Sequence, residues 1–271
     1  MDILPSANLT YFVGPITNLR ISYSHSVNRP EFREIASTGF YDFIKYELVG
    51  GNPDLKRSLA SNFDIRMELF PDLGELFAVS YFRKDIKGAI EEKLIQAATR
   101  TRTWFNSDQA QNAGWEFEIR KSLGFISNML RGLSVTANYT VVRSAVNVYQ
   151  TSGNSILTTT IQSTRPMQGQ SPYLLNVSLL YTSPSAGTSL NFLFNKFGRR
   201  LDAVGFLASD IYEEPRDLVD LAATQPLGWG TELKLTVKNL NNSRRTLTRD
   251  NLLYENTGVG RTYSIQISKS I

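Results

Sequence analysis

The feature that most constrains this chain is a strict alternation of apolar and polar side chains, which recurs along its whole length. The last stretch, residues 260–271, shows the pattern most clearly. Neighbouring side chains of an extended strand point to opposite faces, so this stretch predicts a strand with one apolar and one polar face. The apolar set is Tyr263, Ile265, Ile267 and Ile271, and the polar set is Ser264, Gln266, Ser268 and Ser270.

Similar stretches predict about eleven strands, most of them about 9–12 residues long, near the length that a tilted strand needs to cross a bilayer. Their connections are alternately short and long, as in outer-membrane barrels, which have short turns on one side and long loops on the other. The strands are expected at about 7–13, 18–28, 59–70, 75–86, 115–120, 133–141, 173–181, 188–197, 217–225, 232–238 and 260–271. The long connections are expected at about 29–58, 87–112, 144–170, 198–215 and 239–258.

The two faces of the expected strands differ in charge. The polar faces carry residues such as Arg66, Glu118 and Lys234, whereas the apolar faces carry almost no charge. A charge on the lipid side of a barrel costs about 2–4 kcal/mol at mid-bilayer, but a wet lumen tolerates it. The sequence therefore predicts an all-β, antiparallel, up-and-down transmembrane β-barrel. The alternative is a soluble antiparallel protein that buries the apolar face in its core.

Composition excludes several other functions. The chain has no cysteine, one histidine and a formal net charge of +4. Thiolate metal sites and cysteine nucleophiles are therefore excluded, and the charge is too small to indicate nucleic-acid binding. No cluster has the spacing of a metal site or a catalytic constellation, and we expect neither an enzyme nor a cofactor. His25 lies on an apolar face and is interpreted as an interfacial residue.

Strand direction indicates that the chain is part of a larger barrel. A long connection precedes the final strand, so this strand is expected to run from the outside to the periplasm. Because successive strands alternate in direction, the first of eleven strands runs in the same direction as the last. Single-chain bacterial barrels normally have an even number of strands. About eleven strands that begin outside therefore predict a C-terminal fragment or a truncated gene product.

Several stretches of the chain are distinctive motifs: residues 18–36 (NLRISYSHSVNRPEFREIA), 40–43 (FYDF), 51–56 (GNPDLK), 112–118 (NAGWEFE), 238–241 (KNLN) and 260–263 (GRTY). Together they resemble the barrel domain of the TonB-dependent outer-membrane receptors, and they occur in family order. The chain departs from the family pattern at Arg57 and Ser58, where the family has Pro-Glu, and at Ile271, where the family usually has Phe.

This resemblance implies a 22-stranded barrel closed by an N-terminal plug, of which residues 1–271 would be the C-terminal half, without plug or signal peptide. It implies TonB-dependent uptake of a scarce nutrient, such as a ferric siderophore, cobalamin or an oligosaccharide, across the outer membrane of a Gram-negative-type bacterium. Expected partners are outer-membrane lipid and lipopolysaccharide, the TonB complex through the plug region, the barrel-assembly machinery and the nutrient, but no nucleic acid. A passive porin-like channel or a soluble β-rich binding protein are the alternatives.

The long connections hold the candidate ligand-binding residues, because binding groups concentrate in loops. Arginine and aromatic side chains in these connections suit a flat or anionic ligand, which they can bind by stacking and charge-assisted hydrogen bonds. Alternatively, the arginines bind lipopolysaccharide phosphates or other loops. The candidates are Arg29, Arg33, Tyr41, Phe43, Arg102, Trp104, Arg200, Tyr212, Arg216 and Arg245.

Overall fold

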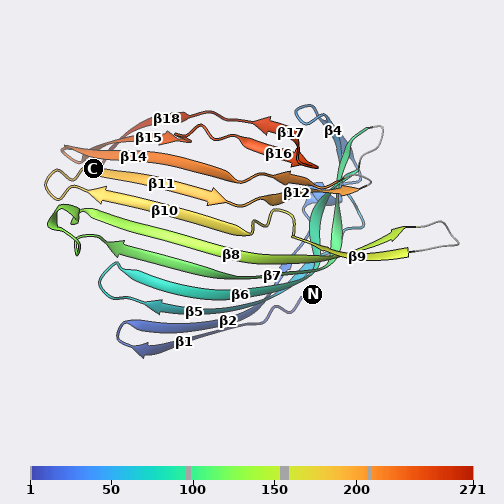
Figure 1. Ribbon diagram of the computed structural model, residues 1–271, viewed down its shortest axis with the longest axis horizontal. Coiled ribbons are helices and arrows are strands. Elements are labelled where there is room, and N and C mark those ends of the chain that lie inside the picture. The colour runs from blue at the N-terminus through green and yellow to red at the C-terminus, as the bar shows by residue number, and fades with distance from the viewer. Residues whose placement is uncertain (1, 96–98, 153–158, 207–208, 271) are drawn as a thin grey trace.

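The long strands lie side by side in chain order in the computed structural model (Figure 1), which describes residues 2–95, 99–152, 159–206 and 209–270. Within these ranges eleven strands form one antiparallel sheet, here called the wall. Each overlaps one predicted stretch, so the alternation pattern is confirmed. The wall contains β1 (Ser6–Gly14), β2 (Thr17–Asn28), β5 (Ser58–Leu69), β6 (Leu76–Ile95), β7 (Thr101–Ser122), β8 (Leu133–Ser152), β10 (Tyr173–Thr182), β11 (Ser189–Phe197), β14 (Arg216–Gly228), β15 (Thr231–Lys238) and β18 (Thr262–Lys269).

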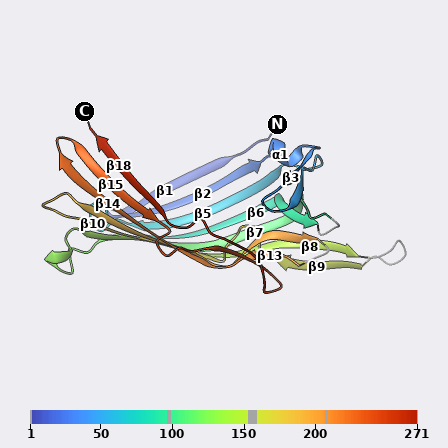
Figure 2. The same ribbon diagram turned by 90° about the horizontal axis from the view of Figure 1, so that it is seen from above.

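The wall is curved and open, as expected for part of a barrel (Figure 2). Among the described residues, β1 pairs along its length with β2 alone and β18 with β15 alone. One edge of each strand therefore presents unpaired backbone N–H and C=O groups. Ile271, which the family resemblance singled out, lies outside the described residues.

Strand register separates the two faces of the wall. Residues paired across neighbouring strands share a face, so each row of partners lies wholly on one face of the wall. Phe117, on the apolar face, is 46% exposed, whereas Glu68, on the polar face, is 7% exposed. We call the crowded polar face the inner face and the apolar face the outer face. An outer row contains Ile21, Ile65, Tyr81, Trp115, Val141 and Tyr173, and the adjacent inner row contains Arg20, Arg66, Ser80, Glu116, Thr140, Leu174, Phe197 and Arg216.

Charges on the inner face pair with one another. Arg66 donates from Nε to Glu68 (2.8 Å) and from Nη2 to Glu118 (2.7 Å). Arg20 donates to the second oxygen of Glu68 (2.7 Å). Charged residues that were predicted from the sequence to lie on a wet inner surface therefore form a network of ion pairs across β2, β5 and β7.

Short connections gather at one end of the wall and long ones at the other (Figure 1), which confirms the predicted alternation. The long connections are not irregular, however, and the expectation of a polar loop at 87–112 was wrong. Strands β6 and β7 continue to pair up to Ile95 and Thr101. Both faces of this extension lie beyond the apolar rows, so side-chain polarity no longer alternates there although the backbone stays extended.

Smaller elements fill the remaining connections. No helix in the described residues is long and apolar enough to cross a membrane. The elements are α1 (Phe32–Ile35), η1 (Asn128–Leu130), β3 (Gly39–Asp42), β4 (Glu47–Gly50), β9 (Thr159–Arg165), β12 (Arg200–Phe206), β13 (Ile211–Glu213), β16 (Arg245–Arg249) and β17 (Leu252–Thr257).

The hairpins at the long-loop end extend the paired ends of β6 and β7 into a further part of the sheet, here called the loop sheet, which is continuous with the wall. Strand β4 runs parallel to the end of β7, and β12 runs parallel to the end of β6. Strands β13, β16 and β17 continue this sheet by antiparallel pairing. Leu94, Ala203, Ile211 and Leu247 form a buried cluster beneath it, against which Tyr254 packs. This small core fixes hairpins that are far apart in the sequence against one another.

Candidate ligand-binding site

A buried ion pair fixes β4 against the β6–β7 hairpin. Arg102 of β7 donates from Nε to Glu47 of β4 (2.6 Å) and from Nη1 to Glu92 of β6 (2.5 Å). Glu47 is 1% exposed and Arg102 is 7% exposed. Burial alone would lower the pKa of Arg102, but hydrogen bonds and attraction from Glu47 and Glu92 outweigh it and raise this pKa. The guanidinium therefore stays charged and serves as a fixed link between three strands.

A second ion pair connects β6 to the last residue of β9 and the segment that follows it. Arg165 donates two hydrogen bonds to the carboxylate of Glu91 (2.9 and 2.7 Å), which is itself buried. The backbone N–H of Gln168 also donates to Glu91 (2.9 Å). The Gln168 side chain accepts from the N–H of Glu92 and donates to the carbonyl of Asp202, both at 2.6 Å. This segment therefore links the end of β6 to β12.

A third group of charges joins β12, β13 and β16. Arg200 donates from Nε and Nη2 to one oxygen of Glu213 (3.0 and 2.8 Å). Arg245 lies 3.5 Å from the other oxygen of Glu213, and it donates a hydrogen bond to Asp202. Burial raises the pKa of the Asp202 carboxyl, although the charges of Arg245 and Arg102 act in the opposite direction.

These three groups border a cavity of about 540 Å³ on the inner side of the loop sheet. Four of the predicted binding residues line it: Trp104, Arg200, Arg216 and Arg245. Arg102 lies behind the lining, where it holds Glu92 in place. The structure thus brings together residues from four different strands whose shared location the sequence did not reveal.

Arg216 differs from the other arginines of the cavity. Its guanidinium lies over the ring of buried Phe197, 5.6 Å from the centroid, and Arg200 stacks on the same ring at 4.4 Å. Its Nε is buried and has no hydrogen-bond partner. Within the described ranges Arg216 forms no ion pair, whereas Arg200 and Arg245 each contact carboxylates. Arg216 therefore supplies a positive charge that the cavity itself does not neutralise.

The other predicted binding residues lie outside this cavity. Arg29 pairs with Asp2, and the guanidinium of Arg33 lies 4.6 Å from the centroid of the Phe40 ring. Three aromatic candidates are likewise occupied by local contacts. Tyr41 and Phe43 pack edge to face with centroids 5.2 Å apart, and Tyr212 lies under Arg199 at 4.2 Å.

Sequence reasoning missed the acidic half of the cavity. Glu34, Glu92, Asp202 and Glu213 all line it. The search passed over them because it considered only cationic and aromatic side chains. A usable signal was present, since the same long connections that are rich in arginine also contain these carboxylates.

The chemistry of the cavity suits the binding of a ligand. In the described parts of the chain, no group of three His, Cys, Asp or Glu side chains could hold a metal ion. The cavity offers an indole ring, amide groups and one guanidinium that no carboxylate neutralises. These groups can stack on a planar ligand and bind an anionic group, in a setting where most other charges are already paired.

Comparison with known proteins gives a family match. Residues 2–242 match the family model described as TonB dependent receptor-like, beta-barrel. No curated protein sequence matches the chain.

Several solved structures share the fold. A ferric enterobactin receptor mutant from Pseudomonas aeruginosa is 18% identical, with a TM-score of 0.62 over 99% of this chain and 40% of that one. A siderophore receptor from Acinetobacter baumannii is 16% identical, with a TM-score of 0.62 over 99% of this chain and 41% of that one. An iron transporter from Neisseria meningitidis is 14% identical, with a TM-score of 0.61 over 98% of this chain and 39% of that one. The chain thus spans about two fifths of the length of these structures.

Proposed function

The chain belongs to the TonB-dependent receptor β-barrel family, and on that premise we propose that it forms part of an outer-membrane receptor for a ferric siderophore. The similar structures are described as siderophore receptors and an iron transporter. The apolar outer face of the wall supports placement in a membrane, because such a face would otherwise be exposed to water. The proposed role is binding and uptake, without chemical conversion of the ligand.

The observation that carries the binding role is the unneutralised guanidinium of Arg216 in an inward-facing cavity. An anionic ligand would pair with it and be positioned against Trp104 and the Arg200 side chain. Ferric catecholate siderophores combine planar metal-binding rings with net negative charge, which suits these contacts. Uptake would further require the TonB complex acting through a plug region, and insertion of the barrel would require the assembly machinery.

The test is ligand affinity of the full-length protein, with ferric enterobactin as the probe. Arg216→Met keeps the apolar stem over Phe197 and removes the charge. A hydrogen bond to a charged group contributes about 1.5–3 kcal/mol, so affinity should fall roughly 10- to 150-fold. Arg199→Met is the matched control, because Arg199 lies in the same layer but is ion-paired with Glu214 and does not line the cavity.

Two results would contradict the proposal in different ways. Equal affinity of the Arg216→Met variant and the unmodified protein would exclude this cavity as the binding site. Failure of the unmodified, correctly folded protein to bind any ferric siderophore would instead show that the ligand class is wrong.

A further inference from the structure

Glu34 and Arg216 are the two charged groups of the inner cavity that lack a counter-charge among the described residues. Every other carboxylate of the described lining contacts an arginine. The contacts are Glu92 with Arg102, Asp202 with Arg245 and Glu213 with Arg200. Glu34 and Arg216 do not pair with each other either, so the cavity keeps one negative and one positive charge for a ligand.

The position of Glu34 is set by a close contact between α1 and the turn after β4. The backbone N–H of Asn52 donates to the carbonyl of Glu34 (2.6 Å), and the Asn52 side chain donates to the carbonyl of Trp104 (2.9 Å). A Cβ at Gly51 would lie 2.3 Å from the carbonyl oxygen of Ala36, so this approach requires glycine. Glu34 is therefore fixed beside β7, the strand that carries Trp104.

Arg216 belongs to a different part of the cavity. It is the first residue of β14, and it pairs in register with Phe197 of β11, whose ring lies under its guanidinium. Strands β8, β10 and β11 separate β14 from β7 in the wall. The two charges are thus fixed independently on separate elements, and a ligand that pairs with both needs an anionic and a cationic group.

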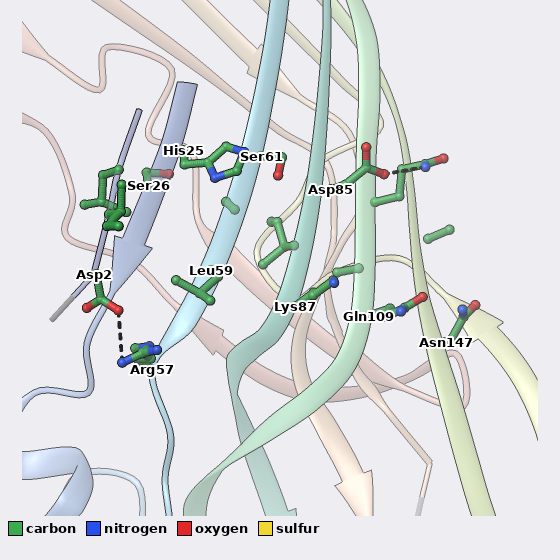
Figure 3. A pocket seen from close by; sticks show the side chains of 17 residues that line it. Asp2, His25, Ser26, Arg57, Leu59, Ser61, Asp85, Lys87, Gln109 and Asn147 are labelled. Atoms are coloured by element: carbon green, nitrogen blue, oxygen red, sulfur yellow. Dashed lines mark hydrogen bonds and ion pairs between the residues drawn. The ribbon is translucent and has the colours of Figure 1, made fainter. Parts of the chain in front are cut away.

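A recess of about 700 Å³ on the outer face of the wall differs from the inner cavity in this respect (Figure 3). Both of its carboxylates are paired, because Asp2 contacts Arg57 (2.9 Å) and Asp85 contacts Arg83 (2.9 Å). As far as the described residues show, this recess has no free carboxylate that could attract a cationic group. In the inner cavity Glu34 provides one.

We propose that the inner cavity recognises a ferric siderophore that carries an ammonium group in addition to an anionic group, an inference that rests on the proposed function. The ammonium pairs with the carboxylate of Glu34, and the anionic group pairs with the guanidinium of Arg216. An ordinary alkylammonium, with a pKa of about 10.4, is charged at neutral pH. A ligand with negative groups alone satisfies Arg216 but brings a like charge towards Glu34, which opposes binding. Glu34 is thus the residue that selects between the two kinds of ligand.

The test measures the affinity of the full-length protein for two ferric complexes by isothermal titration calorimetry. Both complexes contain the same linear trihydroxamate with a carboxylate at one end, and the other end is a free amine in one complex and an acetylated amine in the other. A hydrogen bond to a charged group changes affinity roughly 10- to 150-fold, so acetylation should weaken binding by that factor. Glu34→Gln should bind the two complexes equally, because this variant has no charge with which to distinguish the two ends.

Glu34→Gln should preserve the fold of α1. The Glu34 carboxylate accepts the backbone N–H of Glu31 (2.9 Å) in a capping box, and glutamine can accept the same hydrogen bond. Glu31→Gln is the matched control, because Glu31 is the N-cap of the same helix but does not line the cavity. This control should keep the full difference in affinity between the two complexes.

Each outcome decides a different point. A preference for the free amine in the unmodified protein and in Glu31→Gln, lost in Glu34→Gln, supports the proposal. Equal affinity of the unmodified protein for the two complexes, or an undiminished preference in Glu34→Gln, overturns it. Binding of ferric enterobactin, which has no ammonium, with neither trihydroxamate complex bound also overturns it. If the correctly folded protein binds none of these ferric complexes, the proposed function itself fails.

Discussion

Removal of the Arg102 side chain should detach β4 from the β6–β7 hairpin. Glu47 is 1% exposed, and Arg102 is the cation with which it pairs. In the Arg102→Met variant, Glu47 would keep a buried charge without a counter-charge. Loss of one partner from a buried ion pair typically destabilises by about 3–5 kcal/mol. The damage should be local, because the wall strands do not depend on this contact.

Hydrogen exchange can measure this local opening directly. The N–H of Leu48 donates to the carbonyl of Arg100 (2.9 Å), so its exchange reports whether β4 is attached to β7. If the free-energy cost of local opening falls by about 3–5 kcal/mol, exchange should become roughly 150- to 4500-fold faster. Exchange at Ile119, in the paired centre of β7, should change little.

Two companion variants make the reasoning refutable. Glu47→Gln/Arg102→Met removes both charges, so it should recover much of the lost protection. Arg83→Met breaks an ion pair in which both side chains are about half exposed, and such pairs contribute about 0–1 kcal/mol. If Arg102→Met were no worse than Arg83→Met, or if the double variant were worse than the single one, the buried pair would not be what holds the hairpin.

Three further results are expected. Gly114→Val should lower the thermal unfolding temperature, because a Cβ at Gly114 would lie 2.2 Å from the Val141 carbonyl oxygen, and overpacking typically costs about 1–3 kcal/mol. Lys93→Cys/Val204→Cys should cross-link on oxidation, with a gel-mobility shift, since these residues are paired and the chain has no other cysteine; no cross-link would contradict the parallel β6–β12 pairing. Because the pKa of Asp202 is raised when the hairpins are docked, its contribution to docking is largest at low pH and is lost as pH rises through that pKa. Asp202→Asn should therefore weaken the pH dependence of hydrogen exchange at β12 on the alkaline side of the ordinary aspartate pKa, and an unchanged profile would exclude Asp202 as its source.

The wall could be predicted from the sequence because each strand faces two different environments. Alternation places Ile65 outside and Arg66 inside, and the register carries the same faces across the sheet. Beyond the apolar rows the two faces of a strand meet similar surroundings, and there the prediction of strands from alternation failed. The extension of β6 and β7 reads as a polar loop, although Glu92 and Trp104 are opposite partners in regular pairing.

The cavity was only half predictable for a different reason. Its residues belong to hairpins whose contacts span long separations, such as 55 residues between Glu47 and Arg102 and 74 between Glu91 and Arg165. These partners cannot be predicted from the residues that neighbour each of them in the sequence. The concentration of arginine and aromatic residues in the long connections can be read from the sequence, and Trp104 was predicted as a binding residue in that way.

Knowing the partners changes what an arginine in such a connection implies. Arg102 and Arg165 are paired with buried carboxylates, and these ion pairs join hairpins. Their charges are therefore already neutralised and would attract an anionic ligand only weakly. Arg216, on the inner face, forms no such pair within the described residues. A ligand phosphate or carboxylate gains the most binding free energy from a cation that is not already paired with a carboxylate of the protein. Charge balance therefore indicates that Arg102 and Arg165 serve folding, and it supports the proposed binding role of Arg216, a distinction that the abundance of arginine in the sequence cannot make.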